Sequence, residues 1–235
     1  MEEMYETRKS LPVNIVEMNK YKTESIGMYK MTNHYFGLKG LAMKINGQEY
    51  TLLRDYDKGK YHYLSFDGEV TYLRERVDFI LLNPCRKAMS TAKENDLGLV
   101  LATAICAGIS AASTFLNGKD SRGQDKTFFL GFVRRYLNPA LQDPISSLSI
   151  TWAEWLYRDV RCGLAHGFMI HNGGVEYEVS NFIEEKPCGP EISPKLLLEE
   201  FSKGWTKYLG EVLNGGPSKN LGLLFEQRFK QIFND

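Results

Sequence analysis

The spacing of apolar residues changes near residue 70 and divides this chain into two regions. Before that point, short β-branched and aromatic runs alternate with turn residues, which is typical of strands. After it, apolar residues such as Leu73 and Val77 recur at three- and four-residue intervals, which is typical of amphipathic helices. The pattern predicts an α+β fold, mainly α, with an N-terminal β-rich module over residues 1–75 and an α-helical domain over residues 76–235.

Strands of the first region are predicted at residues 13–16, 27–31 and 61–66. The clearest element is a hairpin, in which residues 41–45 and 48–53 flank Asn46-Gly47. This dipeptide readily adopts the two positive φ angles of a type I′ turn. We therefore expect a small antiparallel sheet ahead of the helices.

The helical region begins with a predicted helix that should break or kink at Asn83-Pro84 and continue to Glu94. An aromatic stripe over 128–137 predicts a core-facing helix. Two final helices are predicted at 194–213 and 219–233.

Residues 97–116 form a run of twenty residues without a charge, long enough to span a bilayer. Many of its residues are small or carry a hydroxyl, which suits close helix packing better than contact with lipid tails. We interpret the run as a buried helix of a protein with no membrane partner, with Asp96 as its N-cap and Asn117-Gly118 as its end.

Thr151 and Glu154 have capping-box spacing and predict the start of a further helix. Its residues divide into two arcs, an apolar one and an opposite one predicted to face away from the core. The apolar arc contains Leu156, Val160 and Leu164, and the opposite arc contains Trp155, Arg158, Cys162, Ala165 and His166. A β-hairpin is predicted after this helix, over residues 168–179 around Asn172-Gly173-Gly174.

Composition gives no sign of a nucleic-acid binder, because 29 basic residues balance 29 acidic ones. Any positive field that attracts RNA must therefore be local. The scattered cysteines form no C-x-x-C pair, and His34, His62 and His171 are too dispersed to indicate a metal site, so no cofactor is expected. The acidic N-terminus does not resemble a secretion signal, and a cytoplasmic location is expected.

The most informative chemistry lies in this helix, where Arg161 precedes His166 by five positions. Metal-free RNA cleavage needs a fixed cation to hold the phosphate and an imidazole to transfer protons. On a regular helix these two side chains are about 140° apart, and Arg158 lies between them. The alternative interpretation is structural: the arginines pair with Asp159 or Glu154, and His166 caps the carbonyls at the helix end.

The segment from Leu156 to Gly167, with its Arg-x4-His spacing near a helix end, resembles the signature of HEPN domains. The helices over 105–118 and 128–137 are similar to the second and third helices of that α-helical bundle, and the resemblance covers roughly residues 76–215. It implies a metal-independent endoribonuclease that forms a homodimer. Arg161 would bind the scissile phosphate, and His166 would activate the ribose 2′-hydroxyl or protonate the leaving oxygen, producing a 2′,3′-cyclic phosphate.

One position departs from the family pattern: Cys162 follows the motif Arg, where a polar residue is usual. Substrate binding is assigned to Arg158, Asp159 and Cys162, although a thiol is a weak hydrogen-bond partner. Many HEPN-like domains are noncatalytic, so the resemblance leaves two functions open. One is an RNase or RNA-binding protein of a defence, toxin or stress system, and the other is a noncatalytic dimeric interaction or scaffold protein.

Overall fold

The computed structural model describes residues 29–30, 42–45, 48–51, 62–63, 65–91, 97–176 and 181–233. The chain divides into two compact units, Met1–Leu64 and Ser65–Phe233. The described residues are mostly helical and include small sheets, which confirms the α+β, mainly α class. The first described helix, α2 (Phe66–Val77), crosses the position predicted as the domain boundary.

Four short strands are described in the first unit, and they form one sheet in the order β1-β2-β3-β4. The strands are β1 (Tyr29–Lys30), β2 (Ala42–Ile45), β3 (Gln48–Thr51) and β4 (His62–Tyr63). β2 and β3 are antiparallel, and Ile45 pairs with Gln48, as the predicted two-residue connection requires. Asn46-Gly47 and the predicted strand at 13–16 lie outside the described residues.

The second unit begins with a long helical rod made of α2, the π-helical turn η2 (Asp78–Leu82) and α3 (Asn83–Thr91). The rod continues through Pro84 instead of breaking there. Pro84 has no N–H to bond the carbonyl four residues earlier, and its ring needs room. The wider π turn supplies that room, and the Asn83 N–H bonds the Asp78 carbonyl five residues back.

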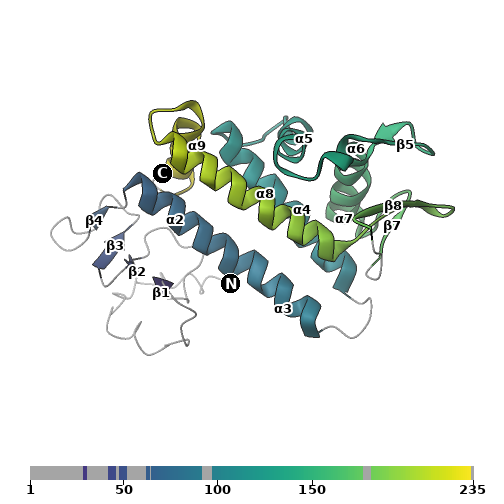
Figure 1. Cartoon of the computed structure of the whole chain (residues 1–235), viewed down its shortest axis with the longest axis horizontal. Helices are drawn as coiled ribbons and strands as arrows, with labels where there is room; N and C mark the ends of the chain where they lie inside the picture. The colour runs from purple at the N-terminus through teal and green to yellow at the C-terminus, as the bar shows by residue number, and fades with distance from the viewer. Residues whose placement is uncertain are drawn as a thin grey trace, which may run out of the picture. The chain divides into compact units, whose positions relative to one another are not determined.

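Helix α4 (Gly98–Asn117) lies within the helical bundle in Figure 1. It contacts α5 (Asp125–Tyr136), α8 (Pro194–Gly215), α9 (Asn220–Phe233) and the helix that carries Arg161 and His166. It ends where predicted, at Gly118, whose φ of 68° is left-handed and whose Cβ position lies 2.7 Å from Leu224 Cδ2. Asp96, the expected N-cap, lies outside the described residues. Among the described helices, α4 alone is long and apolar enough to cross a membrane, and half of that stretch is buried inside the protein.

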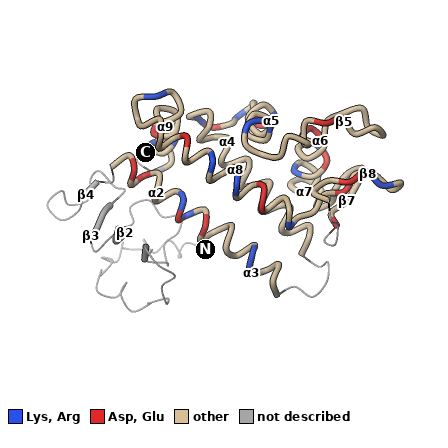
Figure 2. The backbone as a smooth tube through the Cα atoms, viewed as in Figure 1, with Lys and Arg blue, Asp and Glu red and all other residues tan. Residues whose placement is uncertain are grey.

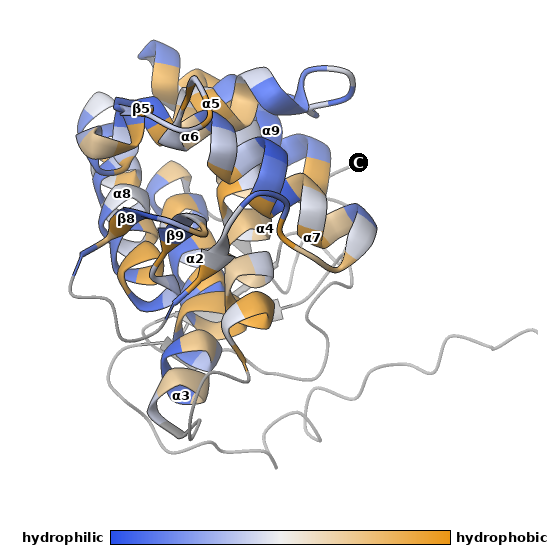
Figure 3. Cartoon of the chain, turned by 90° about the vertical axis from the view of Figure 1, so that its right-hand side faces the viewer, coloured by the Kyte–Doolittle hydropathy of each residue, from blue (hydrophilic) through white to orange (hydrophobic). Residues whose placement is uncertain are grey.

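The aromatic stripe predicted as core is buried on α5 (Asp125–Tyr136), which packs against α4 and α8. Phe132 and Tyr136 contact Tyr208 of α8 (Pro194–Gly215) through their rings. A Cβ at Gly204 would lie 2.5 Å from the Tyr136 carbonyl oxygen, so this glycine lets the two helices approach closely. Figure 3 shows hydrophobic and hydrophilic residues mixed along the helices, as expected for amphipathic elements. The last helix is α9 (Asn220–Phe233).

The motif helix is one continuous rod of three parts: α6 (Trp152–Trp155), η5 (Leu156–Arg161) and α7 (Cys162–Gly167). It follows the short helix η4 (Pro139–Gln142) and a two-stranded ribbon of β5 (Pro144–Ile145) and β6 (Ile150–Thr151). Both hydrogen bonds of the predicted Thr151–Glu154 capping box are present. The central part of the helix is a π turn, which the sequence did not predict.

The hairpin predicted over residues 168–179 is wrong as placed. β7 (Gly174–Val175) pairs in parallel with β9 (Gly189–Ile192), and the hairpin is formed by β8 (Ile183–Lys186) and β9. The Asn-Gly-Gly signal instead marks a tight contact: a Cβ at Gly173, where φ is 143°, would lie 2.2 Å from the Pro190 carbonyl oxygen. The glycine that predicted a local turn is therefore needed for a close contact with a distant segment of the chain.

Candidate functional site

The motif helix buries the predicted apolar arc, because Leu156, Val160 and Leu164 are at most 5% exposed. It packs against α4. Trp155, predicted on the outward arc, is also completely buried. The reason is that the segment after the helix folds back over it, and the Trp155 indole N–H donates to the Asn172 carbonyl at 2.9 Å.

Asp159 lies at the centre of a buried polar network and is 3% exposed. Its Oδ2 accepts from Arg158 at 2.6 and 2.7 Å, and its Oδ1 accepts from the Asn172 amide at 3.1 Å. Its backbone carbonyl accepts from the His171 N–H at 3.2 Å. Because both carboxylate oxygens already accept hydrogen bonds, Asp159 positions Arg158 and the following loop.

Arg161 is half-buried and is held by its neighbours on the same helix. Its guanidinium lies 5.7 Å from the Tyr157 ring centroid, and it donates weakly to Cys162 Sγ at 3.8 Å. Burial raises the pKa of the Cys106 thiol on α4 to about 12, against the opposing effect of the Arg161 charge. Arg161 therefore lies close to a neutral, protonated thiol and makes no ion pair among the described residues.

His166 is exposed in the last turn of α7 and makes no hydrogen bond to any described residue. It does not cap its helix, as the structural alternative expected. The Phe168 N–H bonds the Gly163 carbonyl and ends the helix, and Phe168 adopts a left-handed φ of 55° although it is not glycine. Phe168 and Met169 are 90% and 54% exposed, so the imidazole lies beside an apolar tip.

Within one chain, Arg161 and His166 are not joined by a hydrogen bond among the described residues. The π turn ends at Arg161, so regular α-helical turns separate the two residues, and the predicted angle of about 140° remains. His171 also lies against the motif helix: its Cδ2 is 2.8 Å from the Cβ position of Gly163. The motif region therefore offers two imidazoles, His166 and His171.

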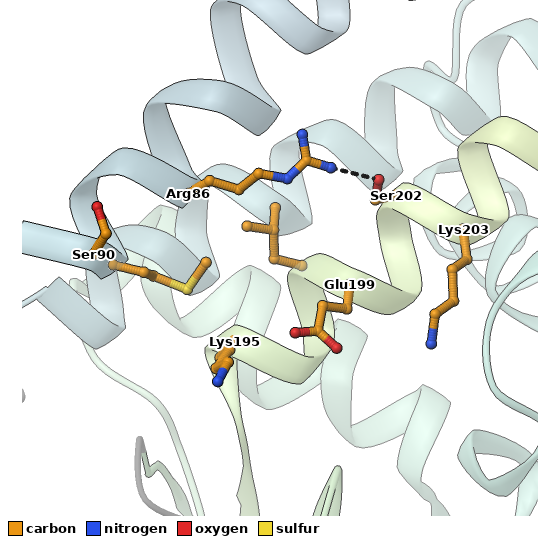
Figure 4. Close-up of a pocket in the computed structure, with 8 residues that line it drawn as sticks. Arg86, Ser90, Lys195, Glu199, Ser202 and Lys203 are labelled. Carbon is orange, nitrogen blue, oxygen red and sulfur yellow. Dashed lines mark hydrogen bonds between the residues drawn. The ribbon is translucent and has the colours of Figure 1, made fainter.

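A groove lined by basic residues lies between α3 and the first half of α8 (Figure 4). Its volume is about 670 Å³. Arg86 extends across it and donates to the Ser202 hydroxyl at 2.8 Å. Lys195 and Lys203 lie along α8 with Glu199 between them, and apolar side chains of Met89 and Leu198 also line the groove.

No local sequence pattern predicts this groove. Its two sides are more than a hundred residues apart, as the 116-residue separation of Arg86 and Ser202 shows. Figure 2 shows basic and acidic residues interspersed over the helices, in agreement with the net charge of zero. A spacing of i, i+4 and i+8 at Lys195, Glu199 and Lys203 was the only available signal, and it is common on solvated helices.

Among the described residues, no group of three or more His, Cys, Asp or Glu side chains is arranged to hold a metal ion. Comparison with known proteins returned no matching family model, no matching curated protein and no matching solved structure.

Proposed function

We propose that this chain is an HEPN-like, metal-independent endoribonuclease that acts as a homodimer. The observation that carries the proposal is the exposed His166 imidazole, which bonds to none of the described residues. It lies at the end of a helix whose other half is fixed by buried contacts of Asp159 and Trp155. A free imidazole on a rigid element is what proton transfer requires.

In the proposed reaction, His166 removes the proton of a ribose 2′-hydroxyl. The 2′-oxygen attacks the adjacent phosphorus, and the bond to the 5′-oxygen breaks. The leaving oxygen takes up a proton, so the products are a 2′,3′-cyclic phosphate and a 5′-hydroxyl. A guanidinium stabilises the negative charge that develops on the phosphoryl oxygens.

A dimer supplies the geometry that one chain lacks. Arg161 and His166 diverge on one helix, so the arginine that meets each imidazole is best supplied by a second copy. The surface next to His166 suits such a contact, because the neighbouring apolar residues Phe168 and Met169 are exposed. Exposed apolar side chains that gather in one place favour protein association.

The basic groove supports RNA binding by a chain without net charge. Arg86, Lys195 and Lys203 provide a local positive field, which the balanced composition requires of any RNA-binding surface. The start of α8 follows β9, whose partner β7 follows the motif helix, so one short sheet links the two regions. We propose that an RNA strand extends from the imidazole along this groove.

The test incubates the purified chain with mixed single-stranded and structured RNA in EDTA and analyses the fragment ends. Wild type is compared with His166→Ala, His171→Ala and the exposed control Arg122→Ala. We expect His166→Ala to lower the rate at least about 100-fold, the usual contribution of a general acid or base. Cyclic phosphate ends should form with wild type and Arg122→Ala. Equal cleavage by His166→Ala and wild type would overturn the role of His166.

The second candidate is a noncatalytic dimeric interaction protein. The contacts that Arg161 makes with its own helix favour this function. Its guanidinium is half-buried against Tyr157 and Cys162, and is less available to a phosphate than a free one. Intact RNA together with a dimer that Met169→Glu dissociates would favour this function. Either candidate fits a cytoplasmic protein of a defence, toxin or stress system, a setting that the family resemblance alone suggests.

A further inference from the structure

The loop that follows the motif helix carries a second imidazole, that of His171, and this loop is fixed to the helix. The His171 N–H donates to the Asp159 carbonyl at 3.2 Å. The next residue, Asn172, donates from its side-chain amide to the Asp159 carboxylate at 3.1 Å, and its own carbonyl accepts from a buried indole N–H of the helix at 2.9 Å. These bonds hold the backbone of His171 against the helix, as a catalytic side chain requires.

Two glycines of the helix make room for the His171 ring. A Cβ at Gly163 would lie 2.8 Å from His171 Cδ2 and 2.4 Å from the Met169 carbonyl oxygen, so a side chain there would displace the loop. Further along the helix, His171 Nε2 is 3.9 Å from the Cβ position of Gly167. One edge of the imidazole therefore lies along the two glycines, with Nε2 close to the end of the helix.

His166 lies on the neighbouring face of the same helix end. On α7 it is about 60° from Gly163 and about 100° from Gly167 around the helix axis. The side chains of His166 and His171 are both exposed, and neither makes a hydrogen bond to a residue that the structure describes. Two imidazoles that can each bind or release a proton therefore lie on adjacent faces of one fixed element.

Three other ionisable side chains of the motif helix are less suited to give a proton to a substrate. Asp159 is 3% exposed, and both of its carboxylate oxygens accept hydrogen bonds. Burial raises the pKa of the Tyr157 hydroxyl. The Cys162 thiol accepts from the Arg161 guanidinium. His171 is therefore the better candidate for a proton donor beside His166.

We propose that His171 is the general acid of the reaction in which His166 is the general base. The inference rests on the proposed RNA cleavage and names the group that protonates the leaving oxygen. Neutral His166 takes the proton of the 2′-hydroxyl, and the 2′-oxygen forms a bond to phosphorus. The bond from phosphorus to the 5′-oxygen breaks with its electron pair on that oxygen, which takes the Nε2 proton of the protonated His171 imidazole. Proton exchange with water then restores both histidines.

The test changes one atom of the substrate. An RNA oligonucleotide is made with sulfur in place of the 5′-oxygen at the linkage that the wild type cleaves, and the unmodified oligonucleotide is the comparison. Thiols are much stronger acids than alcohols, so a thiolate leaves without being protonated. A general acid is therefore needed for the oxygen substrate and not for the sulfur substrate.

Cleavage rates of both substrates are measured in EDTA for wild type, His171→Ala, His166→Ala and the exposed control Arg122→Ala. His171→Ala should slow the oxygen substrate at least about 100-fold, the usual contribution of a general acid, and leave the sulfur substrate close to the wild-type rate. His166→Ala should slow both substrates, and Arg122→Ala neither. His171→Gln keeps a polar side chain without the acid and should behave as His171→Ala does. Circular dichroism checks that each variant is folded.

The outcomes separate this inference from the proposed function. Equal losses on both substrates in the His171 variants would indicate a structural role, and an undiminished rate on the oxygen substrate would show no role; either result overturns the inference. Recovery by sulfur in His166→Ala instead of His171→Ala would exchange the two roles and also overturn it. In each of these cases, RNA cleavage that depends on His166 still supports the proposed function. No cleavage of either RNA by wild type would overturn both.

Discussion

Two π-helical turns in this chain look alike but have different causes. In η2 the Asn83 N–H bonds the Asp78 carbonyl, and in η5 the Cys162 N–H bonds the Tyr157 carbonyl, each over five residues. η2 is followed directly by Pro84, which cannot continue an α-helical bond pattern. η5 has no proline within or after it as far as Gly167.

The cause of η5 lies in tertiary contacts. Asp159 and Trp155 of the motif helix are both bonded to Asn172 in the loop that folds back over it. These buried bonds join two residues of the motif helix to one residue of the loop, and we infer that the wider turn lets both bonds form. Pro84, a local sequence feature, therefore explains η2, which contains no candidate site residue. Long-range contacts explain η5, which ends at Arg161.

The largest expected effect comes from removing Asp159. Asp159→Ala would leave the Asn172 amide and the Arg158 guanidinium without their acceptor, and we expect a loss of about 3 kcal/mol in the free energy of unfolding. Urea denaturation measures it, with Asp143→Ala, an exposed carboxylate, as the control. A loss no larger than that of the control would show that the network does not stabilise the motif helix.

Pro84→Ala tests the local cause of η2. The substitution restores an N–H and removes the ring clash, so we expect a gain of about 1 kcal/mol after allowing for the greater entropy of the unfolded chain. Pro139→Ala is the control, because Pro139 begins η4, where proline is favourable, and its loss should not stabilise. No gain from Pro84→Ala in the same denaturation experiment would mean that packing also imposes η2.

Phe168→Gly tests strain at the end of the motif helix. Glycine adopts the left-handed conformation without penalty, and the exposed Phe168 ring contributes little packing, so we expect a gain of about 0.5–1 kcal/mol. Phe168→Ala keeps the strain and should give no such gain. If Phe168 belongs to the dimer contact, light scattering will show that both variants weaken the dimer. A loss of stability in Phe168→Gly would contradict the strain argument.

The smallest effect concerns the start of the same helix and depends on pH. The Thr151 backbone N–H holds the pKa of Glu154 below its ordinary value of 4.5. A carboxyl with a lowered folded pKa adds stability that is present above pH 4.5 and is lost as the pH falls through the folded pKa. Glu154→Gln should therefore show a slightly flatter loss of stability below pH 4.5 in thermal denaturation. An unchanged acid profile would exclude this contribution.

Much of the fold was predictable because its signals are local. The capping box at Thr151, the left-handed stop at Gly118 and the buried stripe from Phe128 to Leu137 depend on residues within one or two helical turns. The hairpin after the motif helix was misplaced because the conformation of Gly173 depends on its close contact with Pro190, seventeen positions away. Trp155 was assigned to the wrong face because a helical wheel does not show a loop that returns to cover it.

The candidate site, too, has features that the sequence predicted and features that depend on long-range packing. Sequence spacing identified Arg161 and His166, and the described backbone leaves the angle between them as the regular helix predicts. It did not identify the enclosure of Arg161 by Tyr157 and Cys162, the network of Asp159, or the basic groove. Each of these joins side chains whose positions depend on how the chain is packed.

The sequence by itself determined the helical class, most helix ends and the residues of the motif, because hydrophobic spacing and capping act over a few neighbouring positions. The tertiary structure alone decided which motif residues are buried, where the π turn of the motif helix lies, and which distant cations share a groove. Burial and long-range hydrogen bonds are properties of the packed chain. A local sequence pattern identifies a candidate side chain, but the contacts that this side chain makes in the fold determine whether it is available to bind or react.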